Sequence, residues 1–146
     1  RMREIYTHRI PGELKITGGE YRAQWSGTYN YDTPILIDSL SAWKEFIKSH
    51  PEQSVNEDIL QKNYGSAFFK DNVIYAYVKG ESSGSIRLKV KGAELDGDKL
   101  KLSMERINPG GGTFDMATQI CLFGLKRGSI KNVTVVEAII VDKKDN

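Results

Sequence analysis

Residues 86–104 read IRLKVKGAELDGDKLKLSM, and this stretch carries the strongest signal for secondary structure in the chain. In its first half apolar residues alternate with arginine and lysine, so one side of the segment faces a core and the other faces water. Asp96 and Gly97 then form a dipeptide that supplies the positive backbone angles of a tight hairpin. The alternation resumes after this turn at Leu100, Leu102 and Met104. The pattern predicts two antiparallel strands joined by a hairpin.

Segments with a similar preference for β-structure lie on both sides of this hairpin. Three of them are strongly apolar, namely NVIYAYV at 72–78, TQICLFGL at 118–125 and NVTVVEAIIV at 132–141. Two more, rich in β-branched and aromatic residues, lie near the N-terminus, REIYTHRI at 3–10 and GEYRAQW at 19–25. Because strands dominate this pattern, we expect a β-rich protein.

One amphipathic helix is predicted between the N-terminal strands and the β-rich half. It covers the segment DSLSAWKEFIKSH at 38–50, and Pro51 ends it. Polar residues at its start can accept the free amide hydrogens of the first turn. A short second helix is predicted at 56–65, with Asn56 as its cap and Gly65 at its end. The apolar residues at helical spacing in the first helix are Leu40, Trp43 and Ile47.

The chain as a whole is predicted to form one α+β domain in which β-structure dominates, because 146 residues is an ordinary size for a single domain. We expect an antiparallel β-sandwich or a twisted sheet, with the 38–50 helix packed on it. The expected order is N-terminal strands, a helical segment, a β meander and a polar tail. Their ranges are 1–38, 39–65, 66–141 and 142–146.

The composition excludes several classes of protein. Lysine and arginine number 21 against 19 aspartate and glutamate, and a net charge of +2 is too small for the basic surface of a nucleic-acid-binding protein. No apolar run approaches the roughly 18 residues of a membrane span, so no transmembrane segment is expected. Cys121 is the single cysteine, and its apolar neighbours favour an inert buried thiol. The chain begins with Arg1, so we expect a fragment, with any signal peptide or lipid anchor upstream of residue 1.

Residues 80–84 match the G-x-S-x-G pattern of a hydrolase nucleophile elbow. That elbow leads from a strand into a helix, whereas the residues after Ser82 alternate like a strand. Both histidines, His8 and His50, also precede Ser82, against the usual order of that catalytic triad. Neither histidine has a second His or Cys at metal-ligand spacing. The sequence therefore predicts no catalytic residue, no metal site and no cofactor.

Three short motifs together resemble a known group of bacterial proteins. They are FF-x-x-N at 68–72, SGSI at 83–86 and T-x-D-M-A at 113–117. With the helix before them, they are similar to uncharacterised secreted or lipoprotein domains of clostridial bacteria over residues 33–141. The layout is more distantly similar to the C-terminal domain of the protease-complex protein PrcB, whose T-G-G-Y loop corresponds to 83–86. The resemblance implies an extracellular or cell-envelope location, no known enzyme activity and two loops that lie near one another.

These two loops form the first candidate binding site, which consists of Ser83, Gly84, Ser85, Thr113 and Asp115. The Ser-Gly-Ser segment offers amides and hydroxyls at the start of a strand, and Asp115 follows soon after a run of three glycines. Asp115 can accept hydrogen bonds from a ligand or from its own surroundings. In the second interpretation it ties down the neighbouring loop and sets the register of the strands.

An aromatic cluster near the N-terminus is the second candidate site. Tyr21, Trp25, Tyr29 and Tyr31 lie in the segment EYRAQWSGTYNYD, a composition typical of surfaces that bind sugars, peptides or proteins. Half-buried aromatic residues of an ordinary strand would give the same pattern. Both interpretations stay open.

Two functions are compatible with these features. The first is a non-catalytic extracellular or cell-envelope interaction module whose partner is a protein or a cell-wall polymer, because loops joined to rigid strands commonly carry binding sites. The second is a protease inhibitor or a subunit that stabilises a protease complex, since glycine-rich hairpin loops can enter an active-site cleft. An enzyme would need a deep pocket with clustered ionisable groups.

Overall fold

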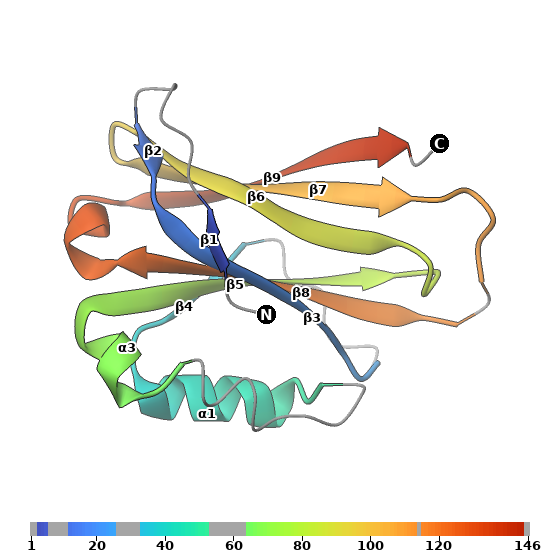
Figure 1. Cartoon of the computed structure of the whole chain (residues 1–146), viewed down its shortest axis with the longest axis horizontal. Coiled ribbons are helices and arrows are strands. Elements are labelled where there is room, and N and C mark those ends of the chain that lie inside the picture. Colours follow the sequence, from blue (N-terminus) through green and yellow to red (C-terminus); the bar gives the residue numbers. More distant parts are fainter. Residues whose placement is uncertain (1–2, 6–11, 26–32, 53–63, 114, 145–146) are drawn as a thin grey trace.

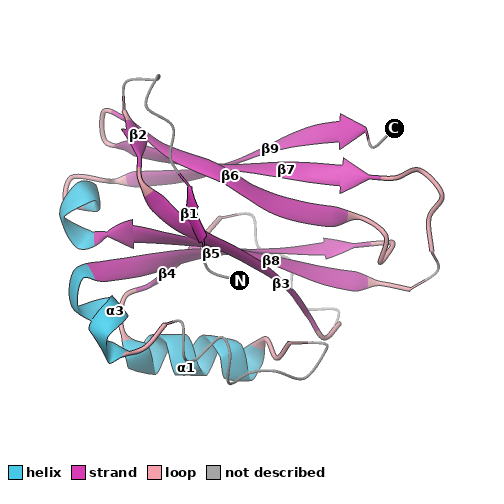
Figure 2. Ribbon diagram, viewed as in Figure 1, coloured by secondary structure: helices cyan, strands magenta, loops and turns pink. Residues whose placement is uncertain are grey.

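The computed structural model describes residues 3–5, 12–25, 33–52, 64–113 and 115–144. Two β-sheets pack face to face, and helices cover the outer face of the larger sheet (Figure 1, Figure 2). This arrangement confirms the predicted fold class, a mostly β, α+β architecture with one main helix. Of the two predicted alternatives, the sandwich is the one observed. None of the described helices is long and apolar enough to cross a membrane.

The larger sheet has five strands, namely β1 (Arg3–Ile5), β3 (Ile16–Ala23), β4 (Ile35–Ile37), β5 (Asn72–Glu81) and β8 (Ala117–Lys126). All of them pair antiparallel, in the order β1-β3-β8-β5-β4. The central strand β8 is buried along its whole length except at Lys126, because helices cover one face of it and the second sheet covers the other.

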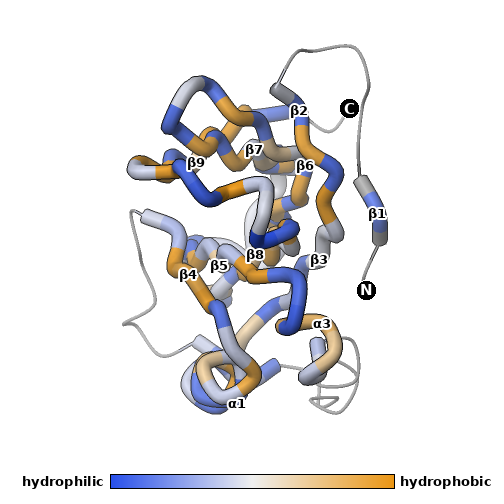
Figure 3. Tube along the Cα trace, turned by 90° about the vertical axis from the view of Figure 1, so that its left-hand side faces the viewer, coloured by the Kyte–Doolittle hydropathy of each residue, from blue (hydrophilic) through white to orange (hydrophobic). Residues whose placement is uncertain are grey.

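The smaller sheet has four strands, namely β2 (Glu13–Leu14), β6 (Arg87–Asp96), β7 (Lys99–Asn108) and β9 (Val135–Lys144), in the order β2-β6-β7-β9. The predicted hairpin joins β6 to β7, and its turn residue Gly97 has a φ of 64°, which confirms the prediction. β9 pairs with β7 in parallel and forms one edge of this sheet. It lies on the same side of the sandwich as β4 (Figure 3).

The predicted antiparallel meander over 66–141 is wrong in its topology. The chain passes between the sheets from β5 to β6, from β7 to β8, and through the 3-10 helix η1 (Arg127–Ile130) from β8 to β9. Because two such crossings reverse the direction twice, β9 runs parallel to β7. The last strand also extends into the predicted polar tail 142–146, since Asp142 pairs in register with Arg106 of β7.

The predicted amphipathic helix is confirmed as α1 (Leu40–Ser49). Ser39 is its N-cap, and the Ser39 Oγ accepts a hydrogen bond from the Ala42 amide at 3.1 Å. This bond satisfies one of the free N–H groups of the first turn. The side chains that α1 buries against the larger sheet are Trp43, Phe46 and Ile47.

A second helix, α3 (Ser66–Asp71), begins after the predicted helical segment 39–65 and corrects its boundary. Gly65, which was expected to end a helix, is instead the N-cap residue of α3. The buried ring of Phe69 anchors α3 on the larger sheet, so packing rather than local propensity decides where this short helix forms. Residues 56–63 of the predicted second helix lie outside the described part of the chain.

The core consists of two apolar layers, one on each face of the larger sheet. Between the helices and this sheet, Trp43 and Tyr64 are the largest fully buried side chains. Between the two sheets, Phe123 and Met104 fill the same role. Cys121 belongs to the second layer, so its thiol is a buried core side chain, as the sequence predicts.

Candidate functional site

The two loops singled out in the sequence lie against each other at one end of the sandwich. One loop joins β5 to β6 and contains residues 83–85, and the other joins β7 to β8 and contains Thr113 and Asp115. The Thr113 amide donates to the Ser83 Oγ at 2.8 Å, and the Gly84 amide donates to the Thr113 Oγ1 at 3.0 Å. The structure therefore brings the residues of the first candidate site together.

The hydroxyl of Ser83 is the centre of this loop contact. Its Oγ lies 2.8 Å from the Ser85 Oγ and 3.1 Å from the Thr113 Oγ1, and it also accepts from the Ser85 amide at 3.3 Å. A hydroxyl has one hydrogen and two lone pairs, so the amides of Ser85 and Thr113 occupy both lone pairs, and the hydrogen is left for one of the two hydroxyl oxygens. The Ser83 side chain is also buried. Through these hydrogen bonds Ser83 holds the two loops together.

Asp115 completes the contact on the other side of Gly84. A Cβ added to Gly84 would overlap the Asp115 Oδ2 and lie 2.8 Å from its Cγ. A hydrogen bond from the Thr113 hydroxyl lowers the pKa of Asp115, helped by the backbone N–H groups of Asp115 and Gly84 and by the charge of Arg22. Arg22 of β3 also donates to the Gly84 carbonyl oxygen. These contacts fit the interpretation in which Asp115 ties down the neighbouring loop.

Replacing Gly84 by alanine is expected to loosen this contact, because the new Cβ displaces the Asp115 carboxylate. We expect amide hydrogen exchange at 82–86 and 109–113 to rise by roughly fivefold, with little change in melting temperature, since local opening of surface loops need not weaken the core. Gly111→Ala is the control, because an added Cβ there meets no atom within 4 Å. Equal exchange in the two variants would contradict this role of Gly84.

A cluster of charged side chains around the buried Glu81 lies beside these loops. No sequence motif predicts it. Glu81, at the end of β5, is only 4% exposed. Arg106 of β7 donates two hydrogen bonds to it, Nε to Oε2 and Nη2 to Oε1, each 2.9 Å long. Lys79 Nζ lies 3.4 Å from Glu81 Oε2, and Arg106 Nη1 lies 3.3 Å from the Oδ1 of Asp142 on β9. The cluster links the two sheets at their loop end.

The cluster keeps Glu81 charged despite its burial. Burial is the largest single influence and raises the pKa of Glu81, but the hydrogen bond from Arg106 and the charges of Lys79 and Arg106 together outweigh it. The pKa of Glu81 therefore lies below its ordinary value of 4.5. The hydrogen bond to Glu81 in turn raises the pKa of Arg106. At neutral pH Glu81 and Arg106 therefore form an ion pair that links the two sheets.

The predicted aromatic patch is wrong in one of its members. Tyr21 was predicted to belong to this patch, and that prediction is wrong. Tyr21 lies in the core between β3 and the helices, and its hydroxyl donates to the His50 carbonyl oxygen at 2.8 Å. The alternation of β3 turns this side chain toward α1 rather than toward water. Trp25 follows β3 and is exposed. Tyr29 and Tyr31 lie outside the described residues.

The serine of the elbow-like motif and His50 belong to different elements of the fold. Ser82 is exposed in the loop after β5, and the strand β6 follows it rather than a helix. His50 caps the C-terminal end of α1, where its Nδ1 lies 2.9 Å from the Phe46 carbonyl oxygen and its ring stacks on the Phe46 ring at 4.2 Å. His8 lies outside the described residues. Within the ranges that the structure describes, no group of three or more His, Cys, Asp or Glu residues could hold a metal ion.

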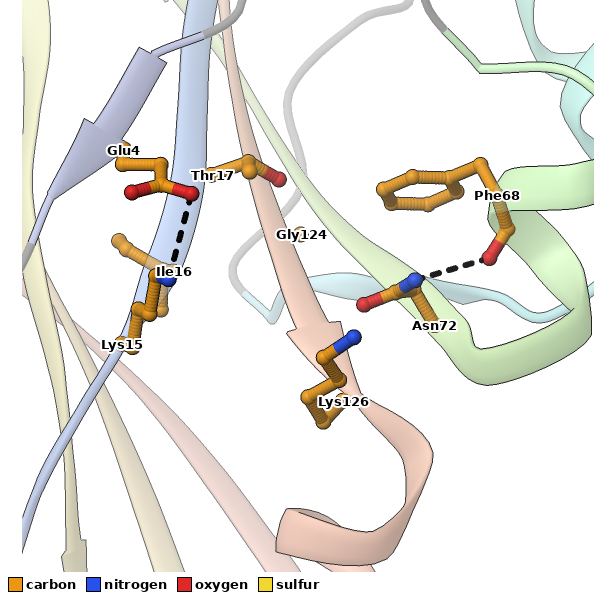
Figure 4. A pocket seen from close by; sticks show the side chains of 8 residues that line it. All are labelled: Glu4, Lys15, Ile16, Thr17, Phe68, Asn72, Gly124 and Lys126. Atoms are coloured by element: carbon orange, nitrogen blue, oxygen red, sulfur yellow. Dashed lines mark hydrogen bonds and ion pairs between the residues drawn. The ribbon is translucent and has the colours of Figure 1, made fainter.

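A pocket of about 200 Å³ lies on the helix side of the larger sheet, beside α3 (Figure 4). Its floor is Gly124 of β8, where an added Cβ would overlap the Thr17 Oγ1 and lie 3.1 Å from the Phe68 Cζ. At one side, Lys15 Nζ and Glu4 Oε1 form an ion pair of 3.2 Å. The volume is below the roughly 300 Å³ at which typical ligand sites begin. Thr17 and Phe68 occupy the space that a side chain at Gly124 would need.

The side of the sandwich formed by β4 and β9 carries exposed apolar residues. Leu36 lies on β4 and is 47% exposed, and Val135 and Val141 lie on β9 and are 47% and 58% exposed. Elsewhere among the described residues, the exposed large apolar side chains are Trp25 and Met116. The sequence predicts the strand at 132–141, but its pattern does not reveal that this strand forms an edge.

Neither a family model nor a curated protein nor a solved structure matches this chain. The resemblance to secreted clostridial domains and to PrcB therefore stays a prediction. Three features bear on function. They are the two loops joined by hydrogen bonds of Ser83 and Thr113, the ion cluster around Glu81, and the exposed apolar residues of β4 and β9.

Proposed function

We propose that the protein is a non-catalytic interaction module of the bacterial cell envelope or extracellular space, and that it binds a protein partner along the edge strand β9. The observation that carries this proposal is the exposure of Val135 and Val141 on a ten-residue edge strand. An edge strand presents a row of unpaired N–H and C=O groups, to which an extended segment of another protein can add. The apolar side chains beside that row supply the contact area.

β9 lacks two features by which proteins commonly protect an exposed edge. It contains no proline, and it pairs with β7 over its ten residues without a register shift. The opposite edge of the same sheet is different, because β2 has only two residues and its neighbour β6 contains a bulge between Val90 and Gly92. Within the described residues, the smaller sheet thus has one protected edge and one open edge.

Replacing Val135 and Val141 together by lysine is expected to abolish partner binding while the fold stays intact. Both side chains are exposed, so lysine disturbs the isolated protein little, but two charges on the edge oppose strand pairing. Wild-type and variant proteins would be immobilised and exposed to the secreted and envelope proteins of a clostridial bacterium. Proteins that are retained by the wild type and lost from the variant support the proposal.

Met116→Lys is the matched control for this experiment. Met116 is 45% exposed, but it lies in the loop before β8 rather than on β9. This variant is expected to retain the same proteins as the wild type. If V135K/V141K also retains them, or if the wild type retains none and does not bind a second copy of itself, β9 is not the binding surface and the proposal is wrong.

The protease-related function is the second candidate, and one observation favours it. The bonds among Ser83, Gly84 and Thr113 hold the two loops in one conformation, and preorganised loops bind a cleft with a smaller loss of entropy. This function predicts slower cleavage by at least one protease in a panel of serine, cysteine and metalloproteases at micromolar protein. Met116→Lys would then weaken inhibition, whereas V135K/V141K would not. Unchanged rates across the panel would dismiss this candidate.

A further inference from the structure

We infer that the partner bound along β9 is a second copy of this chain, with the two β9 strands paired antiparallel about a two-fold axis at Ile140. This inference rests on the proposed function and names its partner. A two-fold contact stops at two copies, because each copy uses the same surface and no further copy can add to it. The two four-stranded sheets then join into one continuous sheet, and the open edge of each copy is covered by the other.

The outward face of β9 is complementary to itself in this register. It carries Glu137, Ile139, Val141 and Lys143, because the residues between them pack toward the other sheet. A two-fold axis at Ile140 sets Glu137 opposite Lys143 of the second copy, and Ile139 opposite Val141 of the second copy. Each of these matches occurs twice across the seam, which is the line where the two β9 strands meet. Opposite charges and apolar pairs in such positions stabilise antiparallel pairing.

Neighbouring registers lack this match. An axis at Ile139 sets Glu137 opposite Val141, and an axis at Val141 sets Ile139 opposite Lys143. On the outward face of β9, both of these registers place a charge opposite an apolar side chain, whereas the axis at Ile140 does not. An axis between two residues would set outward side chains opposite inward ones, which the pleat of the strand does not allow. The sequence of β9 therefore favours the axis at Ile140.

The charges next to the seam continue the same pattern. Within one copy, Lys99 Nζ on β7 lies 3.2 Å from Glu137 Oε2, and Lys143 Nζ lies 3.9 Å from Glu105 Oε1. Across the seam, a row of charges would run from Lys99 and Glu137 of one copy to Lys143 and Glu105 of the other. The signs alternate along this row, so pairing adds a favourable neighbour to Glu137 and Lys143 and sets no like charges opposite each other.

The inward face of the seam also accepts this pairing. Ile140 meets Ile140 of the second copy, and the small side chain of Ala138 lies opposite Asp142 of the second copy. The methyl group of Ala138 leaves room for Asp142 to keep its 3.3 Å contact with Arg106. β4, which carries the exposed Leu36, lies on the same side of the sandwich as β9 (Figure 3).

The charge reversals Glu137→Lys and Lys143→Glu test this register. Each single variant sets like charges opposite one another twice across the seam, and we expect each to raise the dimer dissociation constant by about tenfold or more. The double variant E137K/K143E restores opposite charges and is expected to dimerise like the wild type. An equimolar mixture of the two single variants is expected to form mixed dimers for the same reason. Light scattering after size exclusion and sedimentation equilibrium measure these species across micromolar concentrations.

Lys89→Glu is the matched control, because Lys89 is an exposed cation on β6, two strands away from the seam. It is expected to leave dimerisation unchanged. A monomeric wild type, single reversals that dimerise normally, or a double variant that stays monomeric would each overturn the inference. The proposed function is judged separately. A monomer whose partner capture still depends on Val135 and Val141 refutes the second copy and keeps the proposed function, whereas a monomer without such capture refutes both.

Discussion

The Arg106→Met variant is expected to have a free energy of unfolding about 3 kcal/mol lower than that of the wild-type protein. Arg106 donates both of the 2.9 Å hydrogen bonds that hold the Glu81 carboxylate. Without them this carboxylate stays between the sheets, with Lys79 at 3.4 Å as the remaining cation of the cluster. Leaving a buried charge without its partner costs more than the intact pair contributes. Urea denaturation at neutral pH, followed by the fluorescence of the buried Trp43, measures the difference.

Two further variants separate the buried charge from the loss of packing. Glu81→Met in the Arg106→Met background removes the charge together with its partner. It is expected to recover most of the lost stability, because apolar residues of similar size often replace a buried ion pair without loss. Asp142→Asn removes only the exposed contact of Arg106 and is expected to cost less than about 0.5 kcal/mol. A double variant less stable than Arg106→Met alone would assign the cost to packing.

The difference in stability between Arg106→Met and the wild type is also expected to depend on pH. In the wild type the pKa of Glu81 lies below the ordinary value of 4.5, so the cluster stabilises the folded state above that pH, and this contribution is lost as the pH falls through the folded pKa. In Arg106→Met, burial moves the pKa of Glu81 upward, and protonation at low pH removes the penalty of the buried charge. The difference in stability between the two proteins is therefore expected to begin to shrink above about pH 4.5, as Glu81 of the variant is protonated, and to shrink further below it, as Glu81 of the wild type is protonated. A constant difference down to about pH 3 would contradict this account.

The elements that could be predicted from the sequence are those whose signals are local. The alternation on both sides of Asp96 and Gly97 involves residues two positions apart, and β6 and β7 pair as this pattern requires. The helical spacing of Trp43 and Ile47 places both on one face, and α1 buries that face on the larger sheet. Each of these patterns is complete within one or two elements, so no knowledge of the whole fold was needed.

The features that could not be predicted depend on partners far apart in the chain. Glu81 and Arg106 are separated by 25 residues and belong to different sheets. In the sequence, each therefore looks like an ordinary charged residue of a strand. β7 and β9 pair in parallel because the chain passes through β8 of the other sheet between them. The sequence of β9 does not indicate this path. α3 has six residues, which is too short for a clear helical period.

The candidate site likewise has some residues that could be placed from the sequence and others that could not. The loops around Ser83 and Asp115 could be found because glycine, serine and aspartate cluster there, and the structure joins them through short hydrogen bonds. The aromatic content around Tyr21 did not show which face of β3 each side chain takes, so a core residue was counted in a surface patch. The exposure of Val135 and Val141 depends on the position of β9 at a sheet edge, which a strand pattern alone does not specify.

Gly124→Ala is expected to lower the free energy of unfolding by about 2 to 3 kcal/mol, although it adds only one methyl group. Gly124 lies in β8 at the centre of the larger sheet, between Thr17 of β3 and Ile74 of β5. An added Cβ would overlap the Thr17 Oγ1 and lie 3.1 Å from the Phe68 Cζ and 3.3 Å from the Thr17 carbonyl oxygen. Because β8 is packed on both faces, the strand has little room to move away from this contact.

Two comparisons show whether this crowding is the cause. Gly92→Ala adds the same group to β6, where a new Cβ meets no atom within 4 Å, and it is expected to be neutral or slightly stabilising because alanine reduces the freedom of the unfolded chain. In a Thr17→Ala background, Gly124→Ala is expected to lose most of its cost, because the overlapping Oγ1 is gone. Urea denaturation of the four proteins of this cycle gives the coupling between the two positions. An equal cost in both backgrounds would show that the Thr17 hydroxyl does not create the requirement for glycine.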